Sequence, residues 1–110
     1  MKLPNRSEAY IPSAKLLGYL LSETHSAGKL KAKFFFRFGF TPNNSRLLEE
    51  GILVIAHTSE VLEVEETKHG TKYVLVGELV TPVGRTVNLR TVWVIEHDMD
   101  KPRFVTAYPG

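Results

Sequence analysis

The chain has 110 residues, with 14 basic and 12 acidic side chains, a formal net charge of +2 and an apolar share of 43%. This length fits one domain, and this composition supports a modest core and argues against general disorder. There is no cysteine, which excludes disulfides, thiolate metal sites and a cysteine nucleophile. The sequence has no apolar run of membrane-spanning length and no signal-peptide pattern, so we expect a cytoplasmic protein without membrane association.

After a polar start without periodicity, apolar residues recur at helical spacing in the first half of the chain. We therefore expect residues 1–10 to form an arm and residues 11–58 to be helical. The spacing predicts three helices: 12–22, 29–38 and 46–57. The second helix is expected to face the core with three residues spaced by four, Leu30, Phe34 and Phe38. Gly39 stands where a helix-ending glycine is expected.

From residue 59 onward the apolar pattern changes from helical spacing to alternation. The alternation predicts four strands: 61–67, 72–80, 85–96 and 102–108. Short stretches of turn-forming residues separate them: 68–70, 81–84 and 97–101. The sequence therefore predicts a single α+β domain over residues 1–110. In it, two or three N-terminal helices pack on one face of a four-stranded antiparallel meander sheet formed by residues 59–110.

The loop before the second predicted helix is a candidate anion site. His25 lies in this loop, Gly28 allows the backbone to approach a ligand closely, and Lys31 stands in the first helical turn. Backbone N–H groups at a helix N-terminus bind anions, so these features point to a phosphate or carboxylate. In the alternative interpretation, His25 is an ordinary loop residue and Lys31 a solvated one.

The last two predicted strands carry further polar candidates. In the strand 85–96, alternation assigns Trp93 to the core and Asn88 and Arg90 to the open face. In the last strand, alternation gives two sets: Phe104, Thr106 and Tyr108 on one face, and Arg103, Val105 and Ala107 on the other. Alternation alone does not decide which set shares a face with Arg90.

Several chemistries lack their usual sequence signals. The histidines do not have the spacing of a zinc site, and no glycine-rich phosphate loop or G-x-S-x-G turn occurs. We therefore expect no metal site and no cofactor.

Three stretches of the chain carry a family resemblance: YLLSETHSAGKLKAKFF (Tyr19–Phe35), GTKYVLVGELVTPVGRT (Gly70–Thr86), and the segment from Arg90 to Pro109. They resemble a bacterial domain of unknown function that recurs in small cyanobacterial proteins and at the C-termini of polymorphic toxins. That family is in turn loosely similar to the metal-independent ribonucleases of the barnase, EndoU, colicin and RelE group.

The resemblance implies RNA cleavage by the ribose 2′-OH, which leaves a 2′,3′-cyclic phosphate. It implies five catalytic residues: His25 as base or acid, Lys31 and Arg90 for the charge on phosphate, Thr106 as a hydrogen-bonding group, and Tyr108 as a stacking group. Three residues are expected to bind substrate: Lys29, Asn88 and Arg103. EndoU-type sites hold two histidines, and this sequence offers no clear second one.

The expected partners are therefore RNA and a protein antitoxin encoded in the same operon. A second hypothesis is a non-catalytic, antitoxin-like or regulatory module that docks through the acidic segment Glu60–Glu66. A third is a small nucleic-acid-binding domain without catalysis. A homodimer is also compatible with the sequence, because the strand Val61–Thr67 or the C-terminal strand would leave an open sheet edge.

Overall fold

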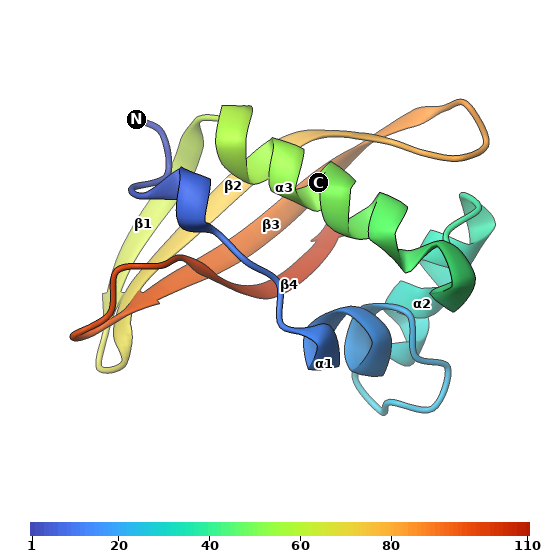
Figure 1. The fold of residues 1–110 in the computed structure, drawn as a ribbon, viewed down its shortest axis with the longest axis horizontal. Helices are drawn as coiled ribbons and strands as arrows, with labels where there is room; N and C mark the ends of the chain where they lie inside the picture. Colours follow the sequence, from blue (N-terminus) through green and yellow to red (C-terminus); the bar gives the residue numbers. More distant parts are fainter.

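The computed structural model describes residues 1–110, and in it every helix precedes the sheet (Figure 1). The helical elements are η1 (Arg6–Glu8), α1 (Ser13–Lys15), the π-helical turn η2 (Leu16–Leu20), α2 (Lys29–Arg37), η3 (Pro42–Asn44) and α3 (Ser45–Thr58). The strands are β1 (Val61–Thr67), β2 (Gly70–Val80), β3 (Thr86–Glu96) and β4 (Arg103–Pro109). This order confirms the predicted α+β fold.

The four strands form one antiparallel sheet in the order β1-β2-β3-β4. Helix α3 lies across one face of this sheet, and α1 lies beside β4 (Figure 1). Strand β2 begins at Gly70, two residues earlier than predicted, because the pair Thr67–Gly70 closes a tight turn of only Lys68 and His69. The sheet therefore has a face covered by helices and an open face.

The core lies between the helices and the sheet, around Trp93 and Phe104. Both side chains are fully buried, and their rings meet edge to face with centroids 5.4 Å apart. The indole Nε1 of Trp93 donates to Thr91 Oγ1 at 2.9 Å, and Thr91 Oγ1 donates to the Leu75 carbonyl at 3.3 Å. These bonds satisfy the buried polar groups, so Trp93 is the core anchor that alternation predicts.

Helix α2 has the predicted position but not the predicted core face. Ala32 and Phe35 are its buried residues, whereas Leu30 is 71% exposed. The expected stripe of Leu30, Phe34 and Phe38 is therefore wrong for Leu30; the two phenylalanines are half-buried. The turn at Gly39 explains why α2 presents a different face to the core from the predicted one.

That turn has the hydrogen bonds of a Schellman motif. Gly39, at a φ of +93°, donates to the Phe36 carbonyl at 3.0 Å, and Phe40 donates to the Phe35 carbonyl at 3.0 Å. Phe40 is thereby placed in the core against Phe35, with ring centroids 6.2 Å apart. Burial of this pair points the Phe35 side of the helix inward.

The first ten residues, which we expected to form an arm, are packed against the rest of the chain. Leu3 is fully buried, and Ile11 just after the segment is buried as well. Tyr10 donates its N–H to the Pro102 carbonyl at 3.1 Å and accepts the Phe104 N–H at 3.0 Å. The segment thus lies beside the start of β4. None of the helices has the length and apolar character that crossing a membrane requires.

Candidate functional site

The pairing of β3 with β4 brings the strand candidates together. Arg90 lies opposite Tyr108, and Val92 lies opposite Thr106. Directly opposed residues project from the same face of a sheet, so Arg90, Thr106 and Tyr108 share the open face. The alternation pattern alone did not decide which residues of the last strand share a face with Arg90.

A β-bulge in β4 causes this arrangement. The register shifts between Val92 and Trp93, and the two residues Phe104 and Val105 together span the position opposite Trp93. Phe104 therefore points into the core while Thr106 points to the open face. The prediction that Phe104 shares a face with Thr106 and Tyr108 is wrong, because the extra residue reverses the alternation.

Lys31 joins this face from α2. Its Nζ lies 6.0 Å from the centre of the Tyr108 ring and 5.9 Å from the centre of the Tyr19 ring. The guanidinium carbon of Arg90 lies 6.0 Å from the centre of the same Tyr108 ring. Two cations thus flank one exposed aromatic ring, at the outer limit of cation–π contact. We call Tyr19, Lys31, Arg90, Thr106 and Tyr108 the cation–tyrosine cluster.

Tyr19 is the member of the cluster that the sequence did not single out. Its hydroxyl lies 2.9 Å from Thr106 Oγ1, which joins η2 to β4. Its ring also meets the ring of His25 edge to face, with centroids 5.1 Å apart, and Lys15 Nζ lies 4.9 Å from the ring centre. The π-helical turn that carries Tyr19 is a rare conformation which often marks a functional position. No local sequence pattern distinguishes such a turn from an ordinary helix.

His25 lies beside the cluster and is held by backbone hydrogen bonds. Its ring Nδ1 accepts the backbone N–H groups of Ala27 and Gly28, each at 3.0 Å, and the backbone N–H of His25 donates to Ser22 Oγ at 3.2 Å. We expected some of these N–H groups at the start of α2 to bind an anion, but His25 itself satisfies them. Because Nδ1 is an acceptor, the neutral ring carries its proton on Nε2.

Gly28 sets how closely α2 approaches Tyr19. A Cβ at position 28 would lie 2.1 Å from the carbonyl oxygen of Tyr19, a distance that no side chain can occupy. Glycine is therefore required here because of the close contact between η2 and the start of α2. This contact brings Lys31 within reach of both tyrosine rings.

The three expected substrate-binding residues lie outside the cluster. Lys29 lines a shallow cavity of about 380 Å³ together with Lys33, Leu30, Phe36 and Glu23. Asn88 is exposed opposite Glu78, further along the open face. Arg103 lies toward the other end of β4, where its Nε and one terminal nitrogen contact Glu96 Oε1 at 2.8 and 2.7 Å. The structure therefore does not bring Arg103 to the cluster.

Comparison with known proteins places the chain in a family. A model described as "Domain of unknown function (DUF6883)" matches residues 2–110. The chain belongs to this family. The comparison with curated proteins gave no match.

The fold also has a counterpart among solved structures. A chain of the "Contact-dependent growth inhibition toxin - immunity protein complex from Klebsiella pneumoniae 342" superimposes with a TM-score of 0.75 and 18% sequence identity. The match covers 93% of this DUF6883 chain and 100% of the other chain. At this identity the similarity establishes a shared fold.

Proposed function

We propose that this DUF6883 chain is a toxin-type endoribonuclease that cleaves RNA through attack of the ribose 2′-OH, without a metal ion. The observation that carries the proposal is the meeting of Lys31 and Arg90 on the ring of Tyr108, from α2 and β3 respectively. Separate elements supply these cations, and a third element, η2, adds Tyr19. Cations beside the exposed ring of Tyr108 suit a nucleotide, because the ring stacks on a base and the cations contact phosphate.

The reaction has a defined charge requirement. The 2′-oxygen forms a bond to phosphorus, the bond from phosphorus to the 5′-oxygen breaks, and negative charge accumulates on the phosphate oxygens between these events. The 2′-OH loses its proton to an acceptor at the site or to water, and the leaving 5′-oxygen gains a proton from water. In the proposal, Arg90 and Lys31 stabilise the phosphate charge, and Thr106 hydrogen-bonds the phosphate or the base.

The hydrogen bonds of His25 bear on both of its expected roles, base and acid. A base acting through Nε2 would need the ring proton on Nδ1, which would break the bonds from Ala27 and Gly28. Proton transfer from an imidazolium would also need a proton on Nδ1 and would break the same bonds, whereas a hydrogen bond donated by Nε2–H of the neutral ring leaves them intact. We therefore assign His25 the role of hydrogen-bond donor to a phosphate oxygen.

A protein antitoxin is the second part of the proposal. The chain with the same fold comes from a structure described as a toxin–immunity protein complex, and this context supports a role in a toxin system. An immunity or antitoxin protein would protect the producing cell from the nuclease.

The test is cleavage of bulk tRNA and of an unstructured RNA in the presence of EDTA, with the 2′,3′-cyclic phosphate ends measured. Lys31→Ala and Arg90→Ala should each lower the rate about 10²- to 10³-fold, because each removes charge stabilisation. The matched control is Lys33→Ala, which removes an exposed lysine of the same helix on the side of the Lys29 cavity. His25→Ala should lower the rate as well.

Each alternative has its own result. RNA binding by the wild-type protein without cleavage would identify a nucleic-acid-binding domain. If the folded protein neither binds nor cleaves RNA, the nuclease is rejected and an interaction module is favoured. An equal rate for the Lys31 and Lys33 variants would show that the cluster is not the active site.

A further inference from the structure

Strand β1 has an outer edge that is paired only at its beginning. The sheet order places β1 at one edge, and Met1–Lys2 covers just the start of that edge, where the Val61 N–H donates to the Met1 carbonyl at 2.7 Å. From Leu62 onward no strand lies outside β1. An uncovered edge offers free backbone N–H and C=O groups for a further strand.

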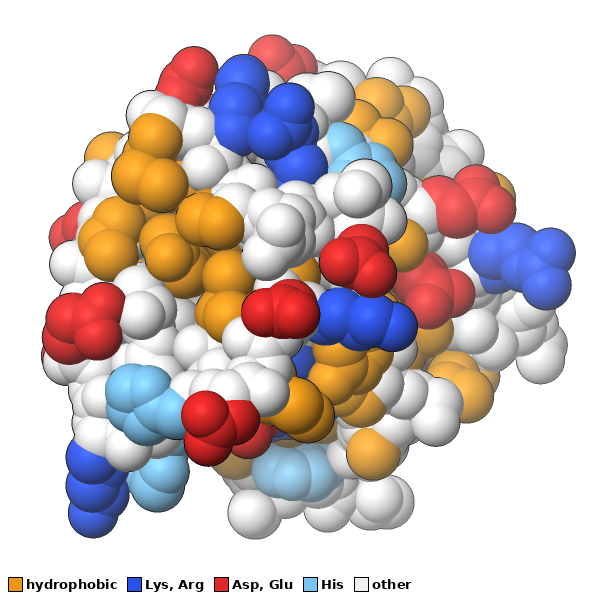
Figure 2. All heavy atoms as spheres, turned by 60° about the vertical axis from the view of Figure 1, so that its left-hand side comes forward, with side chains coloured by type: hydrophobic (Ala, Val, Ile, Leu, Met, Phe, Trp, Pro, Cys, Tyr) orange, Lys and Arg blue, Asp and Glu red, His pale blue; other side chains and the backbone are white.

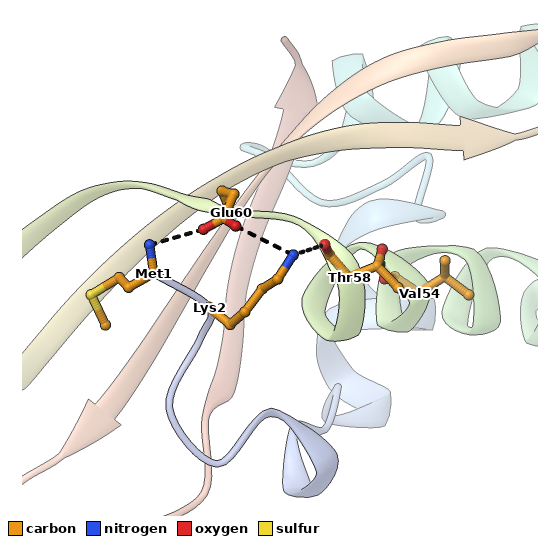
Figure 3. Close-up of polar contacts among 5 residues, drawn as sticks. All are labelled: Met1, Lys2, Val54, Thr58 and Glu60. Atoms are coloured by element: carbon orange, nitrogen blue, oxygen red, sulfur yellow. Dashed lines mark hydrogen bonds and ion pairs between the residues drawn. The ribbon is translucent and has the colours of Figure 1, made fainter.

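The covered start of this edge shows which charge the edge accepts (Figure 3). The ammonium group of Met1 lies 2.8 Å from Glu60 Oε2, and Lys2 Nζ lies 3.5 Å from Glu60 Oε1. Lys2 Nζ also donates to the Thr58 carbonyl at 2.5 Å. The hydrogen bond from the Met1 ammonium, together with the charges of Lys2 and Met1, lowers the pKa of Glu60. An extended, positively charged segment therefore already docks on the first part of the edge.

The uncovered part of β1 carries the same kind of charge. Glu63, Glu65 and Glu66 are all exposed; Glu65 pairs with Lys72 at 2.9 Å, and Glu63 has no ion pair. The hydrogen bond and charge of Glu65, with a smaller effect of Glu63, raise the pKa of Lys72 on the neighbouring strand. Glu63 and Glu65 thus share one neutralising lysine, while Glu66 on the other face of the strand accepts a hydrogen bond from Thr71 Oγ1 at 2.7 Å. The edge remains acidic.

Apolar side chains alternate with these carboxylates. Leu62 is 55% exposed and Val64 is 51% exposed, although both are strand residues. On the side of the molecule that carries β1, hydrophobic side chains gather in a patch with acidic side chains along its border (Figure 2). The edge therefore combines backbone groups, apolar contacts and negative charge, as a strand-binding site requires.

We propose that the outer edge of β1 from Leu62 to Glu66 binds an extended segment of a partner protein, in which lysine or arginine alternates with apolar residues. The bound segment becomes an additional strand of the sheet and continues the line that Met1 and Lys2 begin. A second copy of this chain does not fit, because two β1 edges would bring carboxylates against carboxylates. RNA does not fit either, since its phosphates carry the same charge.

The test uses a blocked peptide of alternating lysine and valine as probe, followed by NMR of the ¹⁵N-labelled full chain. Binding should shift the amide signals of residues 62–66 and slow their hydrogen exchange. The double variant Glu63→Lys/Glu65→Lys should weaken binding about tenfold or more, because two favourable charge contacts become repulsive. The matched control, Glu23→Lys/Glu50→Lys, makes the same change in net charge at exposed positions away from β1 and should bind as the wild type does.

Two further peptides separate strand addition from charge attraction alone. A peptide of the same sequence with alternate backbone amides methylated should lose binding, and a peptide of alternating glutamate and valine should not bind. Equal binding of the methylated peptide would overturn the proposal, as would shifts confined to other residues or no binding at all. Slowed exchange at residues 62–66 that depends on protein concentration alone would assign the edge to a second copy instead. None of these outcomes depends on RNA cleavage, so the proposal stands or falls independently of the nuclease.

Discussion

Replacing Gly28 by alanine should disrupt the contact that positions α2 against Tyr19. The backbone at Gly28 has φ −93° and ψ −18°, a conformation that alanine adopts without strain. The difficulty is steric: the new Cβ would lie 2.1 Å from the Tyr19 carbonyl oxygen and 2.9 Å from its carbonyl carbon. These are backbone atoms, so no side-chain rotation can relieve the overlap, and η2 and α2 must move apart.

The size of the effect follows from that geometry. Forcing an extra methyl group into a packed contact costs about 1–3 kcal/mol. With a urea dependence of about 1–3 kcal/mol per molar, the unfolding midpoint should fall by roughly 1 M. Gly18→Ala is the matched control in the neighbouring η2, because a Cβ there meets no atom within 4 Å. Alanine at position 18 should leave stability unchanged or raise it by up to about 1 kcal/mol.

The assay is urea unfolding followed by the fluorescence of Trp93, the one tryptophan of the chain. Cleavage of RNA, measured under native conditions, should fall in the Gly28 variant as well, because Lys31 moves with α2. A Gly28→Ala midpoint equal to or above that of Gly18→Ala would refute the reasoning, since the close contact would then have no energetic consequence.

Two other predictions concern single polar contacts. A double-mutant cycle of Tyr19→Phe and Thr106→Val should give a coupling of about 0.5–1.5 kcal/mol in urea unfolding, because each single change leaves the other hydroxyl without its 2.9 Å partner; strictly additive effects would contradict this contact. Glu60→Gln should make the free energy of unfolding fall less steeply as the pH is lowered. The pKa of Glu60 in the folded chain lies below its ordinary value of 4.5, so its carboxylate stabilises the fold above that value and the contribution is lost as the pH falls through the lowered pKa. Unfolding curves that change with pH identically in the two proteins would contradict the Met1–Glu60 contact.

The strands and α3 could be predicted from the sequence because local periodicity reports burial directly. Alternation placed β3 within one residue of its observed start, and it identified Trp93 as a core residue. The helical spacing of residues 46–57 likewise corresponds to α3. In each case the pattern spans more than two helical turns or a whole strand, so one dominant face decides the structure.

The arrangement of the site depends on contacts that local periodicity does not report. The bulge at Val105 reverses which residues of β4 face the core, and an alternating pattern contains no mark of that extra residue. The buried face of α2 depends on Phe40, which lies beyond the helix end. The role of His25 depends on two backbone N–H groups that only the folded loop brings to Nδ1. The bulge follows from pairing between strands, whereas the other two features follow from short-range contacts in a loop and at a helix end, which a periodic pattern does not contain.

The two proposed sites lie on opposite edges of one sheet, and this separation has a testable consequence. The cation–tyrosine cluster is built on β3 and β4, whereas the acidic edge is β1, with β2 between them. A partner strand on β1 would therefore leave Lys31 and Arg90 accessible to RNA. If both proposals hold, Lys31→Ala should lower the cleavage rate about 10²- to 10³-fold and keep peptide binding, while Glu63→Lys/Glu65→Lys should keep cleavage and weaken peptide binding about tenfold or more. A protein that blocks the nuclease by covering its active site would then need a contact with β3, β4 or α2 in addition to the β1 edge.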